Sequence, residues 1–354
     1  MTTYNIADNR EHFNFLGRSD VADGKFIMDM TDAGIEFCAD LEGAITFTYD
    51  STEYGTRKIG LVLDNNFKNI YSMILSPEAD SATFRLCIIK GVHNIKLYKL
   101  SEYKQGGLVL NDISFDGTFC DTPKKPPLKF EFYGDSLTCG YGNLCTNGTS
   151  GAGGWKYQDG MQTYAAFAAR TLNAEFSVCS GSGYGIYTGY PYDPENPDNP
   201  RLNTTQTVDD IMNIGFWDKN NTAVDWDFSF DADVVVINLG TNDQSFARIA
   251  KRELPDDEVY AEAKELIDTI RSHNPDCCII WLGGVAGNYE SEYFHGATVL
   301  SKLADETDNM IFYNSMKPSS AGGDGHPTVA QHKVLAEQLV TLIRDNFGEQ
   351  LGLK

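Results

Sequence analysis

The sequence predicts two domains of different class: an all-β sandwich or jelly roll over residues 1–120, and a doubly wound α/β domain over residues 128–354. Two observations predict this division. Short runs of alternating apolar and polar residues fill the first region, while apolar strands alternate with helical patterns in the second. Between them, the three prolines of Asp121–Pro127 cannot continue a strand or a helix, so we expect residues 121–127 to be the linker.

In the first region, turn residues separate the strand-like runs at short and fairly even spacing, which is typical of an antiparallel sandwich or jelly roll. The expected turns are Glu42-Gly43, Asp64–Asn66 and Gly91. The clearest strands lie near Gly34–Cys38, Ala44–Tyr49, Lys58–Leu63, Thr83–Ile89 and Asn94–Leu100.

In the second region, continuously apolar strands alternate with helices, which indicates a parallel sheet covered on both faces. Ligands in such folds sit at the carboxyl ends of the strands. We expect strands near 128–133, 176–179, 234–239, 278–282 and 310–313, and helices near 162–172, 257–272, 298–305 and 327–346.

Composition and charge narrow the possible partners. The formal net charge of −22 argues against nucleic acid, because binding to a phosphate backbone depends on lysine and arginine, whereas a neutral polysaccharide is not repelled. No stretch approaches the roughly 20 apolar residues of a membrane span. Met1–Asp8 has neither a basic nor an apolar signal region, so we expect a cytoplasmic protein, or a secreted one if a signal was removed.

The eight cysteines do not suggest a metal site, because the sequence contains no Cys-x-x-Cys pair. We therefore expect neither a metal nor another cofactor. Cys139 and Cys145 flank a glycine-rich turn, and whether they pair is left open. Four others lie in apolar runs and are predicted to be buried thiols: Cys87, Cys179, Cys277 and Cys278.

The first strand of the second region runs into Gly134-Asp135-Ser136-Leu137. A serine at a strand-to-helix turn presents its hydroxyl at the edge of the sheet, with its own amide directed at any oxyanion that forms there. Ser136 is therefore a candidate nucleophile and oxyanion donor. The alternative is an ordinary serine at the start of a helix.

Two later strand ends offer further oxyanion donors. Asn242, within Gly240–Asp243, has a neutral side-chain amide that can stabilise an alkoxide, although capping of a helix is an equal alternative. Ser180–Gly185 is glycine-rich and lets substrate approach the backbone, so Gly183 is the expected amide donor, with Gly181 close behind. The spacing matches neither glycine-rich nucleotide-binding motif.

A candidate base lies near the C-terminus, where Gly323-Asp324-Gly325-His326-Pro327 precedes the last helix. A histidine in a loop before a helix can reach a serine at a neighbouring strand end and accept its proton. The other histidines are interpreted as surface or core side chains: His12, His93, His273, His295 and His332.

Together, the four segments that contain these candidates resemble the conserved motifs of the SGNH hydrolases. By this resemblance, Ser136 corresponds to the nucleophile, Asn242 and Gly183 to the oxyanion donors, and His326 to the base. The whole chain, including Gly91–Lys99 before the linker, looks like carbohydrate esterase family 2. That resemblance implies an N-terminal jelly roll on an SGNH domain and metal-free removal of acetyl groups from plant polysaccharides such as xylan or glucomannan.

One position departs from the SGNH pattern. The acidic residue usually stands three places before the histidine, where this chain has Gly323, and Asp324 lies two places before it. Two alternatives follow: Asp324 completes a catalytic triad by orienting His326, or a backbone carbonyl does so and leaves a dyad.

Aromatic residues suggest where sugar rings would bind. Trp155, Tyr184 and Tyr187 are the candidates for substrate binding, although tyrosines packed on their own domain are an alternative. Two other functions remain open: a lipase or thioesterase of the same superfamily, and a carbohydrate-binding protein with an idle site.

Overall fold

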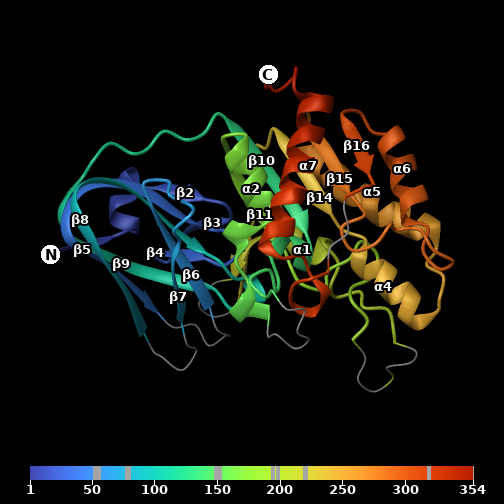
Figure 1. Ribbon diagram of the computed structural model, residues 1–354, viewed down its shortest axis with the longest axis horizontal. Coiled ribbons are helices and arrows are strands. Elements are labelled where there is room, and N and C mark those ends of the chain that lie inside the picture. Colours follow the sequence, from blue (N-terminus) through green and yellow to red (C-terminus); the bar gives the residue numbers. More distant parts are fainter. Residues whose placement is uncertain are drawn as a thin grey trace. The chain divides into compact units, whose positions relative to one another are not determined.

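The computed structural model describes residues 1–50, 57–75, 81–146, 154–192, 196, 200–217, 222–316 and 320–353, without the side chains of residues 81, 154 and 155 (Figure 1). The chain forms two compact units. The first contains Met1–Pro126 and Ile214–Asp227, and the second contains Pro127–Asn213 and Phe228–Lys354.

The first unit is built on one antiparallel sheet, whose described strands follow the order β3-β4-β9-β5-β8-β6-β7, with β1 paired to β9 and β2 to β5. Its core includes the fully buried Phe37, Phe47 and Phe115. The elements are β1 Thr2–Asn5, η1 Ala7–His12, β2 Asn14–Leu16, β3 Ser19–Ala22, β4 Lys25–Met28, β5 Gly34–Asp50, β6 Arg57–Leu63, β7 Tyr71–Leu75, β8 Ser81–Lys99, η2 Tyr103–Gln105 and β9 Leu108–Phe119.

Two of the expected turns are wrong, because β5 and β8 are single long strands. The register of their pairing shifts between Leu41 and Gly43, and Leu41 lies opposite Gly91. Gly43 has φ +92° and Gly91 has φ +150°, backbone angles that glycine adopts without a steric cost. Glu42-Gly43 and Gly91 therefore mark an irregularity inside a long strand pair and do not reverse the chain.

The boundary of the second domain also departs from the expected 128–354, because the hairpin of β12 (Ile214–Trp217) and β13 (Ala223–Asp225) belongs to the first unit. The Trp217 amide donates to Asp29 at 3.0 Å, and its ring stacks on Tyr103 with centroids 4.6 Å apart. Phe216 is buried against Ile27 and Val109. Burial of these apolar side chains stabilises the hairpin on this sheet.

The second unit contains a five-stranded parallel sheet with the order β11-β10-β14-β15-β16. Its strands lie within two residues of the expected ones: β10 Leu128–Gly134, β11 Ala174–Ser180, β14 Val234–Asn238, β15 Cys278–Leu282 and β16 Met310–Tyr313. The order changes direction at β10, so the loops after β10, β11 and β14 meet where such a sheet binds ligands.

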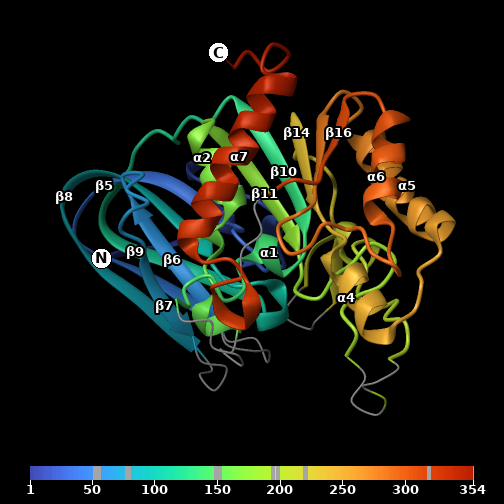
Figure 2. The ribbon, with the colours of Figure 1, turned by 45° about the vertical axis from the view of Figure 1, so that its right-hand side comes forward.

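Helices cover both faces of this sheet. α2 and α7 pack together on one face and α5 and α6 on the other (Figures 1 and 2). The expected α/β class is therefore confirmed. The helices are α1 Ser136–Cys139, η3 Gly154–Tyr157, η4 Gly160–Gln162, α2 Tyr164–Thr171, α3 Asp209–Met212, α4 Thr241–Ala250, α5 Asp256–His273, α6 Gly296–Asp305, η5 Gly323–Gly325 and α7 Val329–Phe347.

Three of the four thiols predicted to be buried, Cys179, Cys277 and Cys278, are buried, but Cys87 on β8 is exposed. None of the eight cysteines, all of which lie in the described part of the chain, forms a disulfide. None of the helices in the described part of the chain combines the length and apolar character needed to cross a membrane.

His332 on α7 is a fully buried histidine. Its Nδ1 accepts a hydrogen bond from the Tyr164 amide at 3.1 Å, which requires the neutral ring with its proton on Nε2. Burial, followed by the nearby His326, lowers the pKa of His332 to about 3. The imidazole therefore stays uncharged in the folded protein at pH values where an exposed histidine is protonated.

We expect His332 to destabilise the protein in mild acid. As pH falls below about 6.5, the unfolded chain binds this proton before the folded chain does, so about 2 kcal/mol of stability should be lost between about pH 7.5 and about pH 5. His332→Asn keeps an acceptor and cannot titrate, so its urea unfolding midpoint should fall less over that range. Equal falls in wild type and variant would contradict the assignment.

Candidate functional site

Ser136 lies at the turn between β10 and α1, as the sequence predicts. The turn is tight because Gly134 has no side chain: a Cβ there would overlap the Thr138 hydroxyl. Asp135 caps the helix, accepting a hydrogen bond from the Leu137 amide at 2.9 Å. Ser136 is therefore the first helical residue and is 9% exposed.

The loop that carries His326 is attached to the turn after Ser136. The Gly323 amide donates to the Gly142 carbonyl, and the Val329 amide donates to the Asn143 carbonyl, both at 3.0 Å. Gly142 has φ +65°, and a Cβ there would lie 2.8–3.1 Å from the Gly323 backbone. Only glycine permits this close approach of the two loops.

This attachment brings together two side chains that are 190 positions apart. His326 Nε2 lies 2.8 Å from Ser136 Oγ, and His326 Nδ1 lies 3.1 Å from the Gly323 carbonyl oxygen. Since a carbonyl can only accept, Nδ1 carries the proton and Nε2 is left as an acceptor. The arrangement can therefore take a proton from the serine hydroxyl.

Of the two alternatives for orienting His326, the structure brings the backbone carbonyl of Gly323 to the second ring nitrogen. Asp324 has φ +51°, and its Oδ2 accepts a hydrogen bond from the Tyr141 hydroxyl at 3.1 Å. The Tyr141 ring lies beside the imidazole, with centroids 4.8 Å apart. The carboxylate thus contacts a residue that flanks His326.

Asn242 lies in the first turn of α4 and is buried. Its Nδ2 donates to the Tyr184 carbonyl at 2.6 Å and to Asp135 Oδ2 at 3.3 Å. Burial raises the pKa of Asp135 to about 7, and the Leu137 amide partly opposes this shift. Sequence reasoning did not identify Asp135 as part of the site, although its place beside Ser136 in the same motif is a signal.

The two candidate glycines differ in what their amides do. The Gly181 amide donates to the Gly134 carbonyl at 3.2 Å and is committed to the backbone. Gly183 has φ +86°, and within the described residues neither its amide nor that of Ser136 donates to a protein acceptor. These two amides are therefore available to a ligand.

The aromatic candidates are only partly placed as expected. The Tyr184 side chain is buried, and Tyr187 donates from its hydroxyl to Glu258 at 2.6 Å, an interaction that, together with burial, raises the pKa of Tyr187 to about 12. The side chain of Trp155 lies outside the described residues. In the same segment, Tyr190 is 45% and Tyr192 81% exposed, so these two rings are open to a ligand.

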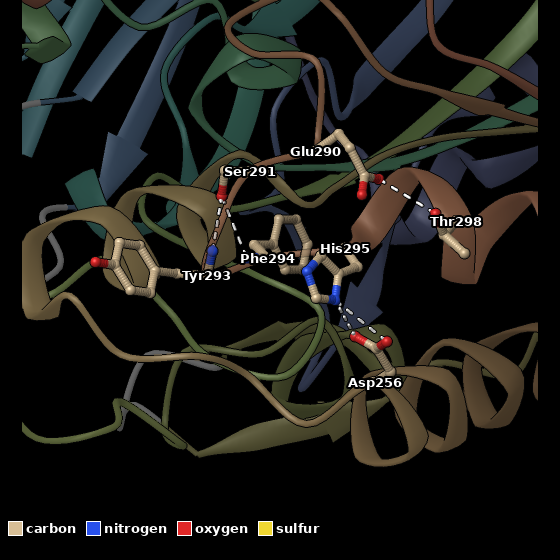
Figure 3. Close-up of polar contacts among 7 residues, drawn as sticks. All are labelled: Asp256, Glu290, Ser291, Tyr293, Phe294, His295 and Thr298. Atoms are coloured by element: carbon tan, nitrogen blue, oxygen red, sulfur yellow. Dashed lines mark hydrogen bonds and ion pairs between the residues drawn. The ribbon is translucent and has the colours of Figure 1, made fainter.

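A second grouping of Ser, His and Asp lies where the loop before α6 meets the start of α5 (Figure 3). His295 Nδ1 lies 3.2 Å from Asp256, but the Ser291 hydroxyl accepts from the amides of Tyr293 and Phe294. Among the residues drawn in Figure 3, the serine is thus held by its own turn, and the histidine joins two helix starts. This grouping is structural, as expected for His295.

No group of three or more His, Cys, Asp or Glu side chains in the described part of the chain could hold a metal ion. The polar groups at the carboxyl edge of the sheet are instead a hydroxyl, an imidazole, an amide side chain and free backbone amides. This set suits acyl transfer to a serine.

The chain belongs to the GDSL-like lipase/acylhydrolase family, whose model matches residues 132–334. The predicted SGNH/GDSL membership is confirmed. The α/β unit has the SGNH-like fold, and the antiparallel sheet of the first unit forms a half-barrel, in agreement with the solved structures of family 2 carbohydrate esterases.

Among named relatives, the chain is 30% identical over 289 residues to the cellulase/esterase CelE of Acetivibrio thermocellus, a match that covers 77% of the chain and 33% of the relative. The chain thus spans about a third of that relative's length. It is 22% identical to an acetylxylan esterase/glucomannan deacetylase of Cellvibrio japonicus over 97% of the chain and 91% of the relative. A family two carbohydrate esterase from Clostridium thermocellum, solved with cellohexaose, superposes with a TM-score of 0.80 at 25% identity, covering 95% of this chain and 99% of that one.

We expect Asp324→Asn to remain active on 4-nitrophenyl acetate. The Gly323 carbonyl remains on Nδ1 of His326, and the new amide oxygen can still accept from Tyr141, so kcat/KM should fall by less than about tenfold. Replacing a triad carboxylate that holds the imidazole costs about 10⁴-fold. A loss of that size would show that Asp324 orients His326. Tyr141→Phe, which removes only the hydroxyl bonded to Asp324, is the matched control.

Proposed function

We propose that this protein is a serine esterase that removes O-acetyl groups from plant polysaccharides, or their oligosaccharides, such as xylan and glucomannan. The observation that carries the proposal is the 2.8 Å contact between Ser136 Oγ and His326 Nε2. The amides of Ser136 and Gly183, which have no protein acceptor among the described residues, support it. Two relatives of the chain are named acetylxylan esterase/glucomannan deacetylase, and these names support the proposed substrate class.

The reaction proceeds in two steps. His326 takes the Ser136 proton as Oγ attacks the acetyl carbonyl carbon, and the tetrahedral intermediate collapses when His326 protonates the departing sugar oxygen. The acetyl group is then on Ser136. Water, deprotonated by His326, attacks it and releases acetate, and His326 returns the proton to Ser136.

The oxyanion of each intermediate is stabilised by the amides of Ser136 and Gly183 and by the side chain of Asn242. The Asn242 NH₂ group already contacts Tyr184 at 2.6 Å and Asp135 at 3.3 Å. Both hydrogens of this NH₂ group are fixed in the plane of the amide. The hydrogen on the longer and weaker contact, to Asp135, is therefore the one that the oxyanion can share as a second acceptor. Removing one such donor typically costs about 100- to 1,000-fold in kcat.

Substrate binding relies on groups that suit a neutral polymer. The exposed rings of Tyr190 and Tyr192 can pack against sugar rings. A cavity of about 1020 Å³, lined by Asn288, Gln331 and Gly325 among others, opens beside the loop of His326 and leaves room for neighbouring sugars.

We also propose that the half-barrel of the first unit is a jelly roll.

Acetate release from acetylated xylan or glucomannan tests this proposal directly. Wild type should release acetate, and Ser136→Ala should lower the rate at least about a thousandfold, because the nucleophile is lost while binding survives. Hydrolysis of long-chain nitrophenyl esters alone would indicate a lipase or thioesterase. Absence of any hydrolysis would indicate a carbohydrate-binding protein with an idle site.

A further inference from the structure

The residue after Asn242 has a carboxylate with an unusual set of partners. Asp243 is fully buried in the first turn of α4 and accepts hydrogen bonds from three consecutive backbone amides. Its Oδ2 accepts from Ile186 at 2.9 Å, and its Oδ1 accepts from Tyr187 at 2.8 Å and Thr188 at 3.0 Å. Burial raises the pKa of Asp243, and the three amides oppose this shift. Because all three amides donate to the same carboxylate, this one side chain fixes the positions of three consecutive residues.

The loop that contains Ile186, Tyr187 and Thr188 curls closely around the Asp243 carboxylate. A Cβ at Gly185 would lie 2.7 Å from Asp243 Oδ2 and would overlap the Thr188 carbonyl, so glycine at 185 permits the curl. On its other side, the Gly185 amide donates to the Gln206 carbonyl at 3.0 Å, and the Val208 amide donates to the Gly185 carbonyl at 3.1 Å. The loop is therefore held between α4 and the segment before α3.

The same loop carries two parts of the oxyanion site. Gly183 and Tyr184 directly precede the curl, and the Tyr184 carbonyl accepts from Asn242 at 2.6 Å. The Gly183 carbonyl accepts from the Tyr190 amide at 2.7 Å, which closes the loop on itself. Two adjacent residues of α4, Asn242 and Asp243, thus hold one loop at two places.

We propose that Asp243 is a positioning residue that sets the Gly183 amide and the Asn242 side chain at the correct distance from Ser136. It acts through the loop and does not touch the substrate. The inference rests on the proposed function, since an oxyanion must form for this placement to matter. A displaced donor destabilises the transition state more than the bound substrate, because the negative charge on the carbonyl oxygen develops only in the transition state.

The test is the isosteric variant Asp243→Asn, in which one acceptor oxygen becomes an NH₂ group facing a backbone amide. We expect kcat on 4-nitrophenyl acetate to fall about 10- to 100-fold with little change in KM. Affinity for a boronic acid that adds to Ser136 should fall by a similar factor, because its boron-bound oxygen occupies the oxyanion position. Unchanged kcat in the folded variant would overturn the inference.

Asp233→Asn is the matched control, because Asp233 also accepts a backbone amide, from Lys129 at 2.8 Å, but at the opposite edge of the same sheet. This variant should keep kcat even where it loses thermal stability. An equal loss of kcat in both variants would reduce Asp243 to a general structural role and overturn the inference.

Amide hydrogen exchange of the wild type supplies a measurement that needs no variant. Ile186, Tyr187 and Thr188 should exchange slowly although they lie in a loop, and fast exchange would overturn the inference. A wild type that exchanges slowly but hydrolyses no ester would overturn the proposed function, and with it the catalytic meaning of this placement. Active wild type with an unaffected Asp243→Asn variant would overturn only the role of Asp243.

Discussion

The close approach of two backbone segments, at Gly142 and Gly323, is the constraint on which the site depends. The parallel sheet brings the ends of its strands to one edge, but His326 does not follow a strand directly. It reaches Ser136 because the loop before α7 is attached to the turn after α1, with no room for a side chain at position 142. The same loop supplies the Gly323 carbonyl that selects the tautomer of the imidazole.

Two buried carboxylates arrange the other half of the site. Asp135 caps the helix of Ser136 and contacts Asn242, while Asp243 gathers the amides of the loop that carries Gly183. Both lie next to a proposed catalytic group in the sequence, so one short motif contains both the reacting group and its support. Neither carboxylate needs to meet the substrate, because their partners are protein amides.

Local patterns predicted the α/β unit well, because its strands are apolar throughout and its helices follow with clear periodicity. The candidates that follow strands, Ser136, Asn242 and Gly183, lie at one edge for the same reason, whereas His326 reaches Ser136 through the attachment of its loop to the turn after α1. Features set by distant contacts could not be predicted: β12 and β13 belong to the first unit although they interrupt the sequence of the second, and glycines 43 and 91 interrupt long strands without turning the chain. The second partner of His326 depends on a loop conformation that no motif encodes. The compartment, inferred only from Met1–Asp8, stays a prediction.

The inserted hairpin has a consequence for how the chain is made. The polypeptide passes between the two units three times, after Pro126, Asn213 and Asp227. During synthesis from the N-terminus, the first 126 residues leave the ribosome well before Phe216 and Trp217, which complete their packing. The first unit therefore cannot complete its packing until nearly a hundred further residues have been translated. A gene truncated at the linker would encode this unit without β12 and β13.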